Sequence, residues 1–134
     1  MKLRRTLLVC TAVSFAAIDL VHKSFAPAEF HHARTQSVAL MMAALIVALV
    51  ILVPRVPSNA AAIGAGIACG GALGNLISLF AWSQGVPDPL VVAGTMHGLA
   101  FNLADLFAIA GDALLLSAVV LHGLRHRASW GEGV

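Results

Sequence analysis

The stretch AAAIGAGIACGGALGNLISLFAW, from Ala60 to Trp82, decides the fold of this chain. It is almost wholly apolar, and a helix that crosses a lipid bilayer needs roughly 20 such residues. Its glycines lie at positions 64, 66, 70, 71 and 74. They give the helix a smooth ridge that lets a neighbouring helix approach closely. We therefore expect a membrane-spanning helix over 60–82 that packs tightly within a helical bundle.

Three further segments meet or approach the length of a membrane span. They are Leu7 to Val21, Ser37 to Val53 and Leu99 to Leu121. The composition agrees, with 60% hydrophobic residues, 10% charged residues and a mean hydropathy of +0.93, far from the balance of a soluble domain. We expect an all-α membrane protein: one integral membrane domain over residues 1–134, built as a four-helix transmembrane bundle with short extracytoplasmic loops.

The charge distribution predicts how this bundle is oriented. The short connection from Pro54 to Asn59 makes the second and third spans an antiparallel hairpin. Most basic residues then fall on one side of the membrane, namely Lys2, Arg4, Arg5, Arg55, Arg125 and Arg127, and only Lys23 and Arg34 fall on the other. By the positive-inside rule both termini are cytoplasmic. Because the first apolar run continues past Cys10 without a small-residue cleavage site, we expect it to be a retained span and not a cleaved secretory signal.

Three carboxylates from separate segments should gather near the outer face: Asp19, Asp88 and Asp105. An acid within the membrane costs at least a few kcal/mol unless it faces the bundle interior or a wet cavity, so each is a candidate functional residue. For Asp19 we favour an ordinary pair with Lys23, four residues later on one helical face. Asp88 stands between two prolines and fits a solvated turn equally well. Asp105, among apolar neighbours, is the strongest candidate.

Two asparagines accompany these acids in the sequence. Asn75 lies in the glycine-rich span, and Asn102 stands three residues before Asp105 as a possible amide partner for a buried acid. A buried amide needs hydrogen-bond partners and tends to orient a neighbouring group. Two asparagines beside two aspartates therefore predict a polar site inside the bundle. Asp112, two helical turns below Asp105, fits a deeper polar path or a hydrogen bond between helices.

Four blocks of the sequence carry a family pattern. They are Asp19-Leu-Val-His-Lys23, Gly70-Gly-Ala-Leu-Gly-Asn75-Leu-Ile, Val86-Pro-Asp88 and Phe101-Asn-Leu-Ala-Asp105. In this order they resemble D-x-x-x-K, G-G-A-x-G-N-L-I, V-V-D and F-N-x-A-D of the lipoprotein signal peptidases (signal peptidase II), which are membrane aspartyl endopeptidases. The last block is the most specific, and together the blocks cover much of the chain apart from the second span.

The resemblance implies a function and a set of roles. The substrate would be a diacylglyceryl-modified prolipoprotein in the bacterial cytoplasmic membrane, cut just before its lipidated cysteine. Asp88 and Asp105 would be the catalytic pair, since two close carboxylates share one proton and can act as base and acid. Asn75 and Asn102 would orient the acids or the substrate, and Asp19 with Lys23 would support the site. No metal or organic cofactor is implied.

The chain also departs from the family pattern. Ser78 and Leu79 stand where the family usually has an Asp-Arg pair, and the segment from His22 to Gln36 is too short for the β-structured cradle that the family inserts there. A catalytically silent relative, which binds lipidated peptides or assists another membrane protein, is therefore the alternative function.

A metal site is the less favoured alternative. His22, His31, His32 and His97 all map to the outer side with Asp19 and Asp88, and imidazoles with carboxylates suit a transition metal. Their spacing matches no ligand motif. Cys10 and Cys69 lie inside apolar runs, where small buried hydrophobes are the usual role, and we expect neither a disulfide nor a metal site from them. The basic residues form no patch interleaved with aromatics, so nucleic acid is not an expected partner.

Overall fold

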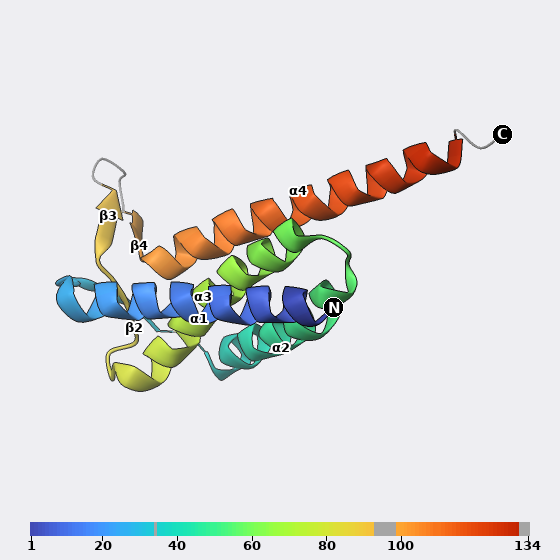
Figure 1. The fold of residues 1–134 in the computed structure, drawn as a ribbon. Helices are drawn as coiled ribbons and strands as arrows, with labels where there is room; N and C mark the ends of the chain where they lie inside the picture. Colours follow the sequence, from blue (N-terminus) through green and yellow to red (C-terminus); the bar gives the residue numbers. More distant parts are fainter. Residues whose placement is uncertain (34, 93–98, 132–134) are drawn as a thin grey trace.

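The computed structural model describes residues 1–33, 35–92 and 99–131. Four long helices make up most of it (Figure 1): α1 (Lys2–Phe25), α2 (Gln36–Leu52), α3 (Asn59–Ala81) and α4 (Leu103–Gly131). Each is long and apolar enough to cross a membrane. The fold is therefore that of a multi-pass membrane protein, as the hydropathy of the sequence predicts.

Helix α3 is the centre of the structure because α1 and α4 both pack along it. Its glycines form two ridges and not one. Gly66 and Gly70 lie against the backbone and side chains of α1, whereas Gly64 and Gly71 lie against the backbone of α4. Gly111 of α4 completes the second contact by lying against the backbone of α3. Small residues on both faces thus let three helices meet at short range.

Helix α2 is the least enclosed of the four, and none of its residues is buried. At the start of α2, the Thr35 hydroxyl accepts a hydrogen bond from the Val38 amide. Such a side-chain cap satisfies one of the backbone amides that have no partner in the first turn of a helix. The short 3-10 helix η1 (Val53–Arg55) follows, and the Ser58 hydroxyl then caps α3 by accepting from the Ala61 amide. Prolines around this turn prevent a continuous helix. The expected antiparallel hairpin of the second and third spans is present (Figure 1).

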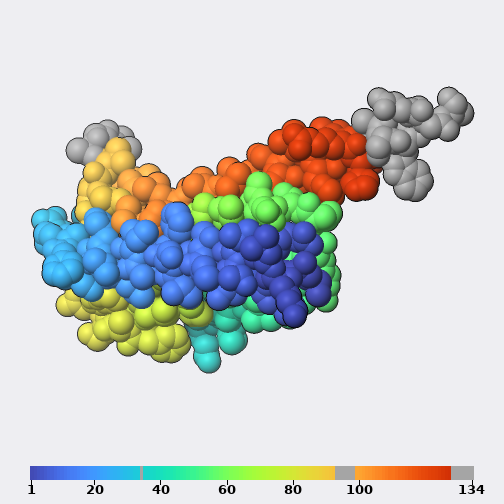
Figure 2. Space-filling model, in the orientation of Figure 1, coloured from blue at the N-terminus to red at the C-terminus, as the bar shows by residue number. Residues whose placement is uncertain are grey.

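The start of α1 and the C-terminal part of α4 lie toward the same end of the molecule as η1 (Figure 1). There the guanidinium of Arg4 donates a hydrogen bond of 3.0 Å to the carbonyl of Pro54, which ties the start of α1 to the turn between α2 and α3. The C-terminal half of α4 runs away from the other helices (Figure 2). The end of the molecule at η1 therefore carries the basic residues of α1, of the turn and of α4. The acids of the site lie at the opposite end.

Short strands occupy these connections, and the sequence analysis did not predict them. Strand β1 (Phe30–His32) pairs antiparallel with β2 (Val86–Asp88), and β3 (Leu90–Val92) pairs antiparallel with β4 (Leu99–Phe101). The pairing of β3 with β4 uses residues that we assigned to the fourth span, so α4 begins at Leu103 and not at Leu99. Through these pairings, the segment before α2 lies beside the segment after α3, and the latter lies beside the residues that precede α4.

Candidate active site

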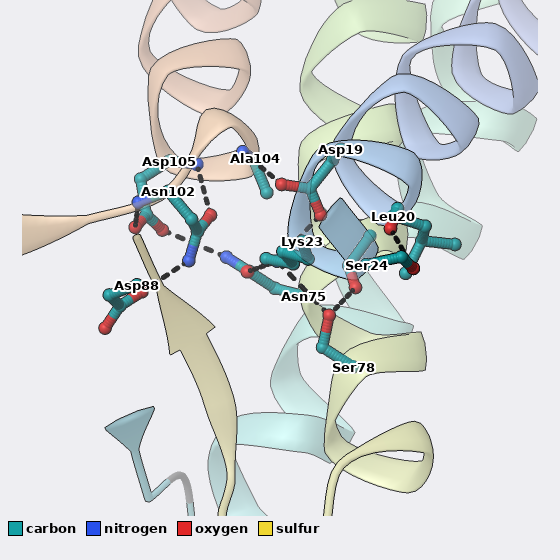
Figure 3. Close-up of polar contacts among 11 residues, drawn as sticks. Asp19, Leu20, Lys23, Ser24, Asn75, Ser78, Asp88, Asn102, Ala104 and Asp105 are labelled. Carbon is teal, nitrogen blue, oxygen red and sulfur yellow. Dashed lines mark hydrogen bonds and ion pairs between the residues drawn. The ribbon is translucent and has the colours of Figure 1, made fainter. Parts of the chain in front are cut away.

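The first part of the site is a buried group of four side chains, which we call the lysine cluster: Asp19, Lys23, Asn75 and Ser78 (Figure 3). The ammonium of Lys23 donates to Asp19 Oδ2 at 2.7 Å, to Asn75 Oδ1 at 2.9 Å and to Ser78 Oγ at 3.2 Å. An ammonium has three hydrogens, so these acceptors satisfy it completely. The predicted pair of Asp19 with Lys23 is confirmed, and it lies in the interior of the protein.

The second oxygen of Asp19 reaches the start of α4. Its Oδ1 accepts a hydrogen bond of 2.9 Å from the backbone amide of Ala104. The first amides of a helix have no partner within the helix, and a carboxylate is well placed among them because of the helix dipole. Gly74 makes room for this acid, since a Cβ there would stand 2.5 Å from Asp19 Oδ2. Asp19 therefore joins α1, α3 and α4.

Asn102 and Asp105 form a reciprocal cap at the first turn of α4. The Asn102 Oδ1 accepts from the Asp105 amide, and Asp105 Oδ2 accepts from the Asn102 amide, each at 3.2 Å. This is the arrangement of a capping box, in which the residue before the helix and the third helical residue satisfy each other's backbone. The spacing of Asn102 and Asp105 in the sequence thus has a local structural cause, and it fixes the direction of the Asp105 carboxylate.

Asn75 connects the lysine cluster to Asp105. Its oxygen accepts from Lys23, and its Nδ2 donates to Asp105 Oδ1 at 2.9 Å. An amide with both ends engaged cannot rotate freely, so Asn75 transmits the position of Lys23 on α1 to Asp105 on α4 (Figure 3). A buried asparagine thus donates to an acid, and its role in orienting that acid stays a prediction.

Asp88 comes from β2 and is completely buried. Its Oδ1 accepts a hydrogen bond of 2.6 Å from the Nδ2 of Asn102, and its Oδ2 contacts the Nδ1 of His32. The interpretation of Asp88 as a solvated turn residue is wrong, because β1 pairs with β2 and removes this stretch from solvent. Strand pairing, and not the flanking prolines, fixes the acid.

Asn102 bridges the two acids that the sequence singled out. Its side chain donates to Asp88 and accepts from the backbone of Asp105, and its own amide donates to the Asp105 carboxylate (Figure 3). Asp19, Asp88 and Asp105 are therefore joined in one network through Asn75, Asn102 and Lys23. The three carboxylates come from α1, β2 and α4 and meet at one end of the helices, as we expected.

Sequence reasoning missed two side chains of this network. Ser78 looked like the loss of a polar pair, yet it is buried, accepts from Lys23 and donates to the Gly74 carbonyl at 2.7 Å. Its position three residues after Asn75, on the same helical face, was a usable signal. His32 was treated as a solvated or metal-binding residue. Its contact with Asp88 depends on pairing between strands that are far apart in sequence, and no local pattern indicates it.

The histidine-based metal site gains no support from the geometry. Within residues 1–33, 35–92 and 99–131, no three His, Cys, Asp or Glu side chains are placed to hold a metal ion. His97 lies outside the described residues. Both cysteines are free, with Cys10 exposed and Cys69 buried. Asp112 is exposed on α4 and is not turned into the packed face of that helix.

An apolar groove lies beside the site, with a volume of about 730 Å³. Its walls come from the C-terminal part of α1, the residue that follows it and the first residue of α4: Ala17, Ile18, Val21, His22, Phe25, Ala26 and Leu103. The Nδ1 of His22 is buried and has no hydrogen-bond partner among the residues that the structure describes. Leu103, which lines the groove, immediately follows Asn102 in the sequence.

The fold and the site together define a class: a multi-pass membrane protein with two buried aspartates bridged by an asparagine at one end of its helices. The family model of signal peptidase (SPase) II matches residues 5–121. This match covers most of the chain, so the chain belongs to the signal peptidase II family. Membership implies cleavage of lipoprotein signal peptides by an aspartic peptidase. No curated protein and no solved structure matches the chain.

Proposed function

We propose that this chain is an active lipoprotein signal peptidase. It cuts diacylglyceryl-modified prolipoproteins just before the lipidated cysteine, with Asp88 and Asp105 as its catalytic pair. The observation that carries the proposal is the Asn102 bridge, which binds one carboxylate through its side chain and the other through its backbone.

The reaction follows from the pairing of the acids. Two neighbouring carboxylates share one proton because ionising both is unfavourable. The ionised acid takes a proton from water while the water oxygen attacks the scissile carbonyl carbon, and the protonated acid gives its proton to the carbonyl oxygen. When the tetrahedral intermediate collapses, the carbon–nitrogen bond breaks, and the leaving amine takes the proton that the first carboxylate received from water. No redox or metal step is required.

The short loops are compatible with activity. The strand that carries Asp88, β2, pairs with β1, which is only three residues long. This short pairing can fix Asp88 without the larger β-structured cradle of the family. Ser78, at a position where the family usually has an acid, keeps a polar contact to Lys23. These two contacts support an active enzyme over the alternative of a catalytically silent relative.

The orientation in the membrane supports the same substrate. Arg4 and Arg55 lie at the end of the molecule opposite the acids. If that end is cytoplasmic, as the positive-inside rule predicts, the acids lie at the outer face of the bacterial cytoplasmic membrane. Lipid-modified precursors present their cleavage site there. The apolar groove on α1 offers a surface for the apolar part of such a precursor.

The test is cleavage of a synthetic lipidated prolipoprotein peptide by the purified protein in detergent. We expect Asp88→Asn and Asp105→Asn each to lower kcat by about 1,000-fold or more, the scale of a lost acid–base group. The matched control is Asp112→Asn, which removes an exposed acid of α4 outside the site and should retain wild-type kcat. Circular dichroism of each variant checks that the helices are intact.

Full activity in either acid variant would contradict the assignment of the pair. Binding of the lipidated peptide without any cleavage by the wild-type protein would favour the silent relative. Loss of cleavage on adding a chelator, with metal found in the purified protein, would favour the histidine hypothesis.

A further inference from the structure

The first outer connection brings a histidine onto one of the two acids. Residues 30–32 form β1, and the Nδ1 of His32 contacts Asp88 Oδ2. The Asp88 carboxylate is fully buried, whereas the side chain of His32 is 60% exposed. His32 therefore covers the buried acid from the solvent side. Neither the acid–base scheme nor the four sequence blocks uses this residue.

The strand register explains why His32 and not His31 reaches the acid. Phe30 pairs with Asp88, His31 with Pro87, and His32 with Val86. Successive side chains of a strand point to opposite faces, and diagonal neighbours on one face are within reach of a long side chain. His32 lies on the face shared with Asp88, and His31 lies on the other face.

The contact gives the second oxygen of Asp88 a partner. Its Oδ1 is held by the Asn102 amide and its Oδ2 by the imidazole. A carboxylate held at both oxygens keeps one orientation. Asp105 is held in a comparable way by Asn75 and by the Asn102 backbone. Each of the two acids thus has hydrogen-bond partners at both of its carboxylate oxygens.

We propose that His32 is a positioning residue of the peptidase: its Nδ1–H group donates to Asp88 Oδ2 and holds this carboxylate in the orientation in which it activates water. The inference rests on the proposed function. It predicts that His32 contributes to kcat and not to binding of the lipidated peptide, because the residue acts on the acid and not on the substrate.

The test compares three variants with the wild-type protein in the peptide assay. His32→Ala removes the donor, and we expect kcat to fall about tenfold, the loss that corresponds to one hydrogen bond to a charged group. KM should stay within about twofold of the wild-type value, since substrate contacts are unchanged. His32→Asn places an amide nitrogen where Nδ1 stands and should restore at least about half of the wild-type kcat. His31→Ala is the matched control and should leave both constants unchanged.

The outcomes separate this inference from the proposed function. If the wild-type protein cleaves and Asp88→Asn does not, but His32→Ala has wild-type kcat, the inference is wrong and the proposed function stands. An equal loss in His32→Asn and His32→Ala, or an equal loss in His31→Ala, would overturn it as well. A wild-type protein without activity would remove both. Nitrogen-15 NMR of the His32 ring gives a readout without turnover, because the Nδ1 resonance should shift in Asp88→Asn if the contact forms and stay fixed if it does not.

Discussion

The site contains two carboxylates that are held in different ways, Asp19 in the lysine cluster and Asp88 on strand β2. Asp19 and Lys23 lie on one helix, their partners lie on the next helix they pack against, and all are buried. Asp88 lies on a three-residue strand and is held by a single amide and a partly exposed histidine. One carboxylate is fixed by helix packing and the other by strand pairing.

From this difference we infer that one part of the site stabilises the fold and that another part carries the proposed catalysis. A buried ion pair loses much free energy when one partner is removed, because the other charge is left without compensation. A carboxylate held by a short strand at the end of the bundle contributes little to helix packing. We therefore expect the lysine cluster to control the free energy of unfolding and Asp88 to control turnover.

The largest effect on stability is expected from Lys23→Met. It leaves Asp19 buried without its counter-ion, and the free energy of unfolding should fall by about 3 kcal/mol. Unfolding with a denaturing detergent in mixed micelles, followed by circular dichroism, measures this change. The double variant Asp19→Asn with Lys23→Met removes both charges and should lose less than the single variant. A double variant as unstable as Lys23→Met would show that the charge pair is not the cause.

A smaller loss is expected from Gly71→Ala. The added Cβ would press on the backbone of α4 at Ala104 and Ala108, next to the turn that holds Asp105. Such overpacking should lower the free energy of unfolding by about 2 kcal/mol and should also reduce cleavage. Gly123→Ala is the matched control, because no other part of the described chain comes within 4 Å of a Cβ at that position, apart from the neighbouring residues of its own helix. If both glycine variants behaved alike, close packing of α3 on α4 would not be what positions Asp105.

The smallest change in stability is expected from Asp88→Asn, although this variant should abolish turnover. An asparagine can still accept from Asn102 through its oxygen, so the free energy of unfolding should change by less than about 1 kcal/mol. The same micelle unfolding experiment measures it. A loss as large as that of Lys23→Met would mean that Asp88 belongs to the structural part of the site, and the division between the two regions would fail.

The sequence was sufficient for those features that have a local signal. The helices follow from apolar length, and the pair of Asp19 with Lys23 follows from helical spacing. The second partner of Asp19, the amide of Ala104, could not be predicted because it depends on how α1 docks at the start of α4. The pattern of side chains along the sequence does not indicate which backbone amide of another helix a carboxylate will bind.

The strands lacked any local signal. Three residues are too few for an alternating pattern, and the pairing of Phe30 with Asp88 joins segments on either side of two long helices. For this reason the sequence allowed both a catalytic and a solvated role for Asp88, and it gave no indication that His32 contacts this acid. Ser78 was read as a departure from a family pattern when its spacing from Asn75 already placed it on the same face.

The two glycine ridges of α3 have a consequence for biogenesis. When a ribosome makes this chain, α1 is already in the membrane as α3 emerges, so the ridge of Gly66 and Gly70 can be covered at once. The ridge of Gly64 and Gly71 stays open to lipid until α4 is inserted. That last helix also brings Asn102 and Asp105, so the step that closes the bundle is the step that completes the site. A nascent chain therefore carries Asp19 and Asp88 before the other half of the polar network exists, and that half arrives only with the final helix.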